Sequence, residues 1–198
     1  MVIHKPAGIL TVPGKTEDLQ DCVINRLLKI EPKTLLIHRL DRDTSGILVF
    51  GLSKWGQKTI SRQFQERQTS KIYQAVVAGH LQGEGTVDIP VIYDPEHPPL
   101  HIVDPSHNKP ALTHWKVIEH FQIQGQAVTR VELTPITGRS HQLRVHMQYL
   151  GHPIIGDTLY ATAEQQQLMP RLCLHAQQLS FHHPKTEELV QFDCPVPF

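Results

Sequence analysis

The densest run of charged side chains in the sequence is nine residues long and lies between two apolar segments. It reads H-R-L-D-R-D-T-S-G over residues 38–46, with L-L-I before it and I-L-V-F after it. Charged residues between two buried strands belong at a sheet edge or in a cleft, where titratable groups are typical of functional sites. A salt-bridged turn has the same local pattern, so both interpretations stay open.

A second polar segment, residues 137–146, reads T-G-R-S-H-Q-L-R-V-H. It holds two arginines and two histidines, and no acidic residue lies between Glu132 and Asp157. On a helix, His141 and Arg144 share one face because they are three residues apart. The apolar residues expected to face the core are Leu143, Met147 and Leu150. The pattern predicts either a positive patch or a solvated helix face.

Composition excludes several classes of protein. The chain has 198 residues, of which 39% are hydrophobic, and its 19 basic and 19 acidic residues balance. We expect one compact domain without bulk polycation binding to nucleic acid. No apolar run approaches the roughly 20 residues that span a bilayer, and no signal-peptide pattern begins the chain. Three widely spaced cysteines without a C-x-x-C pair predict a cytoplasmic protein with no zinc site.

Periodicity and turn residues predict mixed secondary structure. The predicted helices are 21–29, 53–67 and 140–150, and the last one is stopped by Gly151 and Pro153. The predicted strands are 35–37, 47–50, 71–79, 113–117, 127–133, 172–181 and 189–192. Residues 90–110 hold six prolines and predict a long surface excursion. The fold class predicted is α+β, a single domain over residues 1–198 on a mostly antiparallel mixed sheet with flanking helices.

Both polar segments match one known family. The sequence resembles the RluA-type pseudouridine synthases, and among them the small subgroup without an added S4-type RNA-binding domain, which modifies ribosomal RNA and tRNA. The matching segments follow the family's order along nearly the whole chain. They are residues 5–10 (K-P-A-G-I-L), 38–46 (H-R-L-D-R-D-T-S-G), 71–73 (K-I-Y), 135–146 with 151–157, and 171–176 (R-L-C-L-H-A).

The resemblance implies a catalytic set. Such enzymes break the N-glycosidic bond of a uridine in RNA and rejoin the ribose to C5 of uracil. Asp41 then is the catalytic carboxylate, which attacks the ribose C1′ or stabilises positive charge there, as carboxylates do in glycosidases. Arg144 is the cation that keeps Asp41 ionised and oriented, and Tyr73 stacks on the uracil. The detached base itself returns as nucleophile, so the expected enzyme needs no metal and no other cofactor.

RNA is the partner that the resemblance implies, and the target uridine must leave its stack to reach a recessed aspartate. Arg39 matches the family's arginine that fills the vacated space. The predicted helix 53–67 carries Lys54, Lys58 and Arg62 at i+4 spacing, which suits either phosphate contacts or a solvated face. The candidate RNA-binding residues are Arg39, Lys58, Arg62, Arg139 and His141. No membrane or protein partner is implied, and we expect a monomer.

The sequence departs from the family at its beginning. Only four residues precede Lys5, whereas family members usually have a further strand ahead of the K-P motif. We therefore expect the lead-in strand to be missing, which would leave an unpaired sheet edge. The excursion over residues 90–110 can redirect the choice between ribosomal RNA and a tRNA anticodon stem-loop.

Two rival functions share parts of this pattern. One is a catalytically silent RNA-binding or RNA-folding module of the same fold, against which an intact Asp41 argues. The other is a glycosidase acting on small nucleosides, which would need a second carboxylate near Asp41. The nominees for that carboxylate are Asp43, otherwise expected to be structural, and Asp157.

Overall fold

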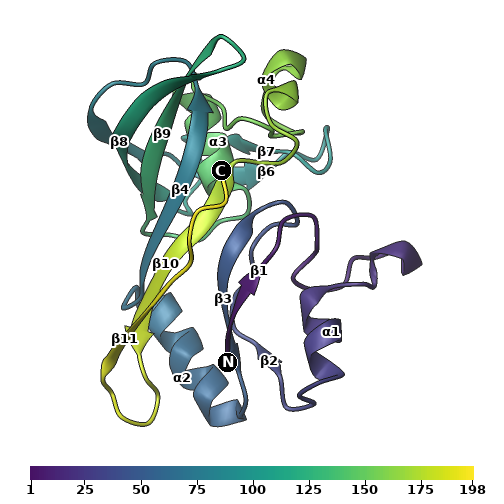
Figure 1. Cartoon of the computed structure of the whole chain (residues 1–198). Coiled ribbons are helices and arrows are strands. Elements are labelled where there is room, and N and C mark those ends of the chain that lie inside the picture. The colour runs from purple at the N-terminus through teal and green to yellow at the C-terminus, as the bar shows by residue number, and fades with distance from the viewer. The chain divides into compact units, whose positions relative to one another are not determined.

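A computed structural model describes residues 1–198, and the chain in it divides into two compact units (Figure 1). The first unit comprises residues 1–71 and 175–197, and the second comprises residues 72–174 with Phe198. The division does not decide whether the two units act as one catalytic domain, so the single domain expected over residues 1–198 stays a prediction. No helix is long and apolar enough to cross a membrane.

The sheet of the first unit is built around β3 (Ser45–Gly51), in which every residue is buried. β3 pairs with β1 (Val2–Lys5) and β2 (Leu35–Leu36) in antiparallel fashion and with β10 (Leu174–His182) in parallel. β11 (Leu189–Asp193) adds to β10. The remaining elements of this unit are the 3-10 turn η1 (Glu17–Leu19), α1 (Val23–Leu28) and α2 (Lys54–Gln65).

α2 covers the sheet of the first unit with an apolar side (Figure 1). Ile60 is buried with Ile47 and Val49 of β3 and with Leu179 and Phe181 of β10. The helix begins where the Ser53 hydroxyl accepts the N–H of Gly56 at 3.0 Å, as expected of an N-cap serine.

Gly46 is required where β3 meets β10. Its φ is +119°, and a Cβ there would collide with the backbone carbonyl of Ala176, its register partner. One residue earlier, the Ser45 hydroxyl lies 2.7 Å from Nδ1 of His175. His175 Nε2 faces the carbonyl of Cys194 at 3.2 Å and must donate to it, so Nδ1 is the acceptor for Ser45. The T-S-G end of the first polar segment therefore stabilises the pairing of β3 with β10.

The second unit contains an antiparallel sheet in the order β4-β9-β8-β5. Its strands are β4 (Ser70–Ala78), β5 (Glu84–Asp88), β8 (Leu112–Ile123) and β9 (Gln126–Pro135). Gln124 and Gly125, both at positive φ, make the tight turn between β8 and β9. Both helices of this unit, α3 (Gln142–Tyr149) and α4 (Ala163–Gln167), follow the sheet in sequence.

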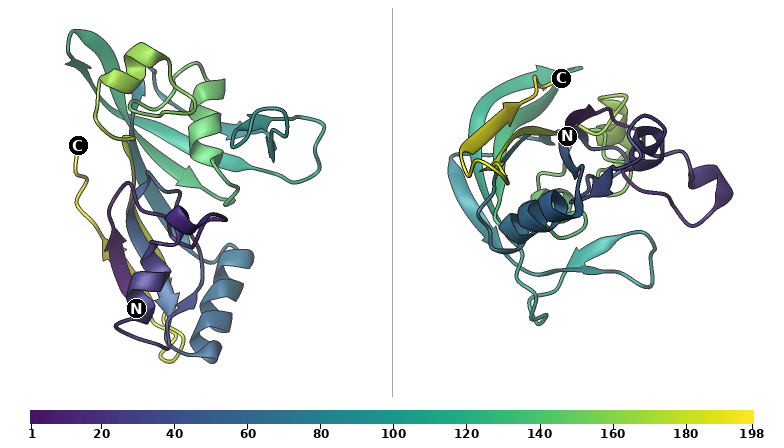
Figure 2. Two further views of the ribbon diagram at one scale, coloured as in Figure 1. Left: turned by 90° about the vertical axis from the view of Figure 1, so that its right-hand side faces the viewer. Right: turned by 90° about the horizontal axis from the view of Figure 1, so that it is seen from below.

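α3 packs one side onto this sheet and lies next to a small hairpin, β6 (Val91–Tyr93) with β7 (His101–Val103) (Figure 2). Leu143 and Met147 are buried in the core with Val131 and Leu133 of β9, and Leu150 packs against them. The predicted core face of this helix is therefore confirmed.

The observed class is the predicted one, α+β with a mostly antiparallel mixed sheet, in which β3 and β10 form a parallel pair. Two strand elements were not predicted. Val2–Lys5 forms a strand paired with residues 46–49, while the expected absence of a further strand ahead of the K-P motif stays a prediction. The 90–110 excursion contains the β6–β7 hairpin, because Val91 packs under α3 beside Val145 and Ala111. Such tertiary packing overrides the local proline signal.

The close approach at Gly46 predicts a stability defect. Gly46→Ala forces a side chain onto a positive φ and against the Ala176 carbonyl, so we expect a loss of about 3 kcal/mol or more in the free energy of unfolding. Urea denaturation followed by circular dichroism measures it. Gly138→Ala, with no atom within 4 Å of its added Cβ, is the control and should stay within about 0.5 kcal/mol. Equal midpoints for the two variants would contradict the constraint.

Candidate active site

The loop that carries Asp41 is clamped to the amino-terminal segment by a buried lysine. Lys5 is only 2% exposed, and its Nζ donates to the carbonyl oxygens of Pro6, Ile9 and Arg42 at 2.8–2.9 Å. The Arg42 carbonyl also accepts the N–H of Gly8 at 2.9 Å. A buried ammonium is tolerated only when its protons are hydrogen-bonded, so the K-P-A-G segment is a brace for the residue after Asp41.

A second clamp holds the residue before Asp41. The buried Thr11 hydroxyl donates to the Leu40 carbonyl at 2.7 Å and accepts the Leu40 N–H at 3.2 Å. The backbone is therefore fixed on both sides of Asp41, while the Asp41 side chain itself is only partly buried. This arrangement presents a carboxylate from a rigid loop, as a catalytic group requires.

His38, at the start of the same segment, has a structural role. Its Nε2 accepts the N–H of Val49 at 3.1 Å, and its ring stacks on Phe64 of α2 at 4.6 Å between centroids. Burial, and next the charge of Lys71, lower the pKa of His38 to about 3. Burial also lowers the pKa of Lys71 to about 8. His38 is therefore a neutral acceptor that ties the loop to the helix.

The segment before α3 is held by Gln142, which is buried. Its Oε1 accepts from the Thr137 hydroxyl at 2.8 Å and from the Arg139 N–H at 3.0 Å. Its Nε2 donates to the Leu112 carbonyl and to the Thr113 hydroxyl, both at 3.0 Å. The helix begins at Gln142 and not at Ser140, because His141 has a left-handed backbone with φ +55°.

Arg144 forms a buried bidentate ion pair with Asp157. Its Nε lies 2.8 Å from Asp157 Oδ2 and its Nη2 lies 2.6 Å from Oδ1, and both residues are at most 3% exposed. Asp157 Oδ1 also accepts the N–H groups of Leu159 and Tyr160. The guanidinium is thus locked in one orientation by a carboxylate that is itself anchored to the backbone.

Tyr160 joins this ion pair to the neighbouring histidines. The Arg144 guanidinium lies over its ring at 5.0 Å from the centroid. Its hydroxyl accepts the backbone N–H of His101 at 2.9 Å and lies 2.6 Å from Nδ1 of His141. The rings of His101 and His141 are 4.7 Å apart. His141, a candidate RNA contact, is therefore positioned by Tyr160 and by the β6–β7 hairpin.

His146 serves packing on the inner side of α3. Its Nε2 lies 3.0 Å from the Ile89 carbonyl and must donate to it, so its Nδ1 accepts from the Thr113 hydroxyl at 2.9 Å. Burial lowers its pKa. This neutral imidazole connects the helix to the chain entering the 90–110 excursion.

The other predicted site residues lie in varied surroundings. Tyr73 is on β4 opposite Leu133 and packs against the core of the second unit. Arg39 is exposed in the Asp41 loop. Arg139 is exposed too, and its Nε donates to the Pro110 carbonyl at 3.2 Å. The two candidates on α2, Lys58 and Arg62, are exposed on one side of that helix.

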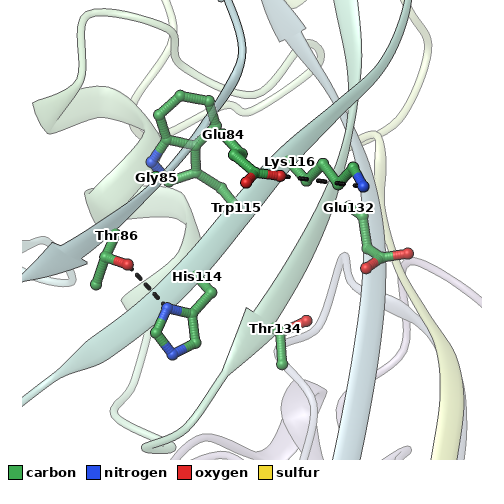
Figure 3. A pocket seen from close by; sticks show the side chains of 8 residues that line it. All are labelled: Glu84, Gly85, Thr86, His114, Trp115, Lys116, Glu132 and Thr134. Carbon is green, nitrogen blue, oxygen red and sulfur yellow. Dashed lines mark hydrogen bonds and ion pairs between the residues drawn. The ribbon is translucent and has the colours of Figure 1, made fainter.

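A shallow pocket on the sheet of the second unit contains none of these residues (Figure 3). Its lining includes a hydrogen bond between the Thr86 hydroxyl and His114 Nδ1 (2.8 Å) and an exposed ion pair of Lys116 with Glu84 (4.0 Å). Glu132 adds a second carboxylate. The balance of charge in this pocket does not favour a phosphate backbone.

Sequence reasoning missed Lys5 and Thr11 as braces and Asp157 with Tyr160 as the support of Arg144. Lys5 and Asp157 lie in the matching segments 5–10 and 151–157, whereas Thr11 and Tyr160 lie outside them. No local pattern says that a residue reaches 13 or 37 positions along the chain, as Asp157 and Lys5 do. The two nominees for a second catalytic carboxylate are both engaged. Asp157 holds Arg144, and Asp43 accepts from Arg42 at 3.2 Å.

Comparison with known proteins gives consistent matches. The family model described as RNA pseudouridylate synthase matches residues 1–149. A "Dual-specificity RNA pseudouridine synthase RluA" of Pasteurella multocida is 46% identical, and one of Escherichia coli K12 is 44% identical, each over 100% of this chain and 90% of the relative. Among solved structures, human "RNA Pseudouridylate Synthase Domain Containing 1" has a TM-score of 0.82 and 32% identity, covering 100% of this chain and 80% of that one.

The low pKa of His38 predicts an acid-sensitive fold. Its pKa of about 3 in the folded protein lies below its ordinary value, so the unfolded chain binds a proton that the folded chain does not. The contribution of neutral His38 to the free energy of unfolding is therefore complete above about pH 6.5. It is lost as the pH falls toward about 3, by up to about 1.4 kcal/mol per pH unit. Between about pH 7.5 and about pH 5, urea unfolding should show a smaller loss of the free energy of unfolding in His38→Gln than in the wild type. His4→Gln, on the exposed side of β1, should behave as the wild type, and parallel losses in all three proteins would refute the assignment.

The buried ion pair predicts a large asymmetry between mutations. Asp157→Asn leaves the Arg144 charge buried without its partner, so we expect a loss of about 3–5 kcal/mol. Asp43→Asn removes an ion pair that is partly exposed and should cost about 1 kcal/mol or less. Urea denaturation compares them. The double change Arg144→Met with Asp157→Asn should cost less than Asp157→Asn alone, because no unpaired charge stays buried and the amide oxygen can still accept the N–H groups of Leu159 and Tyr160. A larger cost would contradict this account.

Proposed function

Because the chain belongs to the RNA pseudouridylate synthase family, it is an isomerase that converts uridine in RNA to pseudouridine, and we propose that it modifies both large-subunit ribosomal RNA and a tRNA anticodon stem-loop. The observation that carries the substrate proposal is the 44–46% identity, over the whole chain, to relatives named as dual-specificity enzymes. The H-R-L-D and G-R-S-H-Q-L-R segments are intact in this chain.

We propose Asp41 as the nucleophile at C1′ of the target uridine. The carboxylate attacks C1′, the bond from C1′ to N1 of uracil breaks, and the base turns so that C5 becomes bonded to C1′. As C5 bonds to C1′, the bond from C1′ to the Asp41 oxygen breaks and the carboxylate is released. The proton on C5 is then lost to solvent and N1 takes up a proton, so the product is an isomer of the substrate. The double clamp on Leu40 and Arg42 supports this role, because a nucleophile gains rate from being held in one place.

Arg144 and Tyr73 complete the proposed catalytic set. Arg144 supplies a fixed positive charge that keeps the nucleophile ionised, and its rigid grip by Asp157 supports such a role. Tyr73 stacks on the uracil and takes part in the removal of the C5 proton.

Arg39, Arg139 and His141 are proposed to contact RNA around the flipped uridine. Exposure of both arginines supports phosphate or base contacts. The enzyme is proposed to act as a monomer in the cytoplasm without a cofactor. The three buried free cysteines suit a reducing compartment, and burial raises the pKa of the Cys173 thiol to about 11.

The rival functions are less well supported. A nucleoside glycosidase needs a second free carboxylate to activate water, whereas Asp157 is bound to Arg144 and Asp43 to Arg42. A silent RNA-binding module would gain nothing from a carboxylate fixed in a loop that faces phosphates.

Asp41→Asn tests the proposed chemistry. We expect it to abolish release of tritium from C5-tritiated uridine in transcripts of both RNAs, while RNA affinity stays within a few-fold, because the group acts chiefly in the transition state. Asp43→Asn, two residues away, is the matched control and should retain activity. Equal activity of Asp41→Asn and the wild type would refute the mechanism, and formation of free uracil and ribose from uridine without RNA would favour the glycosidase.

A further inference from the structure

The exposed side of α2 carries three cations that have no partner. Lys54, Lys58 and Arg62 recur every fourth residue and are all exposed, so they form one stripe along the helix. Their side chains make no hydrogen bond or ion pair, and the helix K-W-G-Q-K-T-I-S-R-Q-F-Q contains no acidic residue. An ordinary solvated helix face mixes both signs of charge, so this stripe points to an anionic partner.

An exposed tryptophan lies beside the stripe. Trp55 is 57% exposed, and at 3.6 residues per turn it is on the same side of α2 as Lys58 and Arg62. Leu52, just before the helix, is 42% exposed. A large aromatic ring next to cations is the combination that binds unpaired nucleotides, since the ring stacks on a base while the cations contact phosphates.

The helix that carries this surface is held rigidly. On its inner side Gln57 donates to the Leu36 carbonyl at 2.7 Å, and Gln63 exchanges two hydrogen bonds of 2.8 Å with the backbone of His182. Phe64 stacks on His38, three residues before Asp41. α2 therefore presents its cations in a fixed relation to the Asp41 loop, which lowers the entropic cost of binding.

We propose that the exposed face of α2, formed by Lys54, Trp55, Lys58 and Arg62, binds the backbone of the substrate RNA beside the target uridine and stacks one unpaired base on Trp55. This inference rests on the proposed function, since RNA must reach the Asp41 loop to which α2 is attached. With a formal net charge of zero, the chain cannot hold RNA by its overall charge, so a local surface of this kind is needed.

The test compares two triple variants with equal charge changes. One is Lys54→Gln/Lys58→Gln/Arg62→Gln. The matched control is Lys15→Gln/Lys33→Gln/Lys185→Gln, whose lysines are exposed and each lie two residues from a glutamate. The probe is a fluorescein-labelled tRNA anticodon stem-loop, and the measurements are its Kd over a range of salt concentrations and the rate of tritium release at saturating RNA.

We expect the α2 variant to raise Kd about tenfold or more and to reduce the slope of log K against log salt by about 2, since each lost phosphate contact contributes about 0.7–0.9. The control variant should change neither. Tritium release at saturating RNA should stay within about twofold of the wild type in the control variant. In the α2 variant it should fall by a smaller factor than the affinity does, because α2 does not touch the reacting atoms. Trp55→Ala should raise Kd about fivefold or more without changing the slope, and Trp55→Phe should restore binding.

Equal Kd and slope for the two triple variants would overturn the proposal. Loss of binding to phosphatidylserine vesicles by the α2 variant, with RNA binding unchanged, would also overturn it and assign the surface to a membrane. Failure of the proposed function is distinguishable: the wild type would then release no tritium from either RNA, whereas the comparison of Kd values decides the role of α2.

Discussion

The buried ammonium of Lys5 is the constraint on which the first unit depends. A charge taken out of water must find equivalent dipoles inside the protein, and here they are the carbonyl oxygens of Pro6, Ile9 and Arg42. One of the three belongs to the residue after Asp41. The charge is satisfied only when the amino-terminal segment and the Asp41 loop are closed on each other, so the lysine makes the loop conformation a condition of folding. The hydrogen bonds of this ammonium therefore add to the packing of Leu40 and His38 in holding the loop.

The second unit solves a similar problem with a buried pair of opposite charges. Arg144 and Asp157 form a buried ion pair, and Asp157 also accepts hydrogen bonds from two backbone N–H groups. Such a pair adds little net stability compared with apolar residues of the same size, so its value lies in orientation. The guanidinium is also stacked over Tyr160, whose hydroxyl reaches His141. His101 of the hairpin therefore contacts the start of α3 in two ways. Its N–H donates to the Tyr160 hydroxyl, and its ring lies next to that of His141.

Local pattern predicted those parts of the fold that local physics determines. The hairpin of β8 and β9, the Ser53 cap of α2 and the core face of α3 follow from alternation, capping and helical period. β1 was missed because four residues give too short a period, and its partner strand lies more than 40 residues away. The β6–β7 hairpin was missed because the six prolines of residues 90–110 are typical of a loop. Asp41 and Arg144 could be singled out from their motifs, but their supports, Lys5 and Asp157, act across distances in sequence that no periodicity reports.

The cations discussed above fall into two groups, one buried and one exposed to solvent. Lys5 and Arg144 are buried and hydrogen-bonded, so each is held in one position. Lys54, Lys58 and Arg62 are exposed, and in the proposed complex they act through the counterions that they displace from a phosphate backbone. A protein with no net charge can therefore bind RNA weakly in general and still concentrate positive potential on one helix. Because α2 is attached to the Asp41 loop by the stacking of Phe64 on His38, binding energy gained on the helix would be available to hold the target nucleotide near Asp41, the proposed nucleophile.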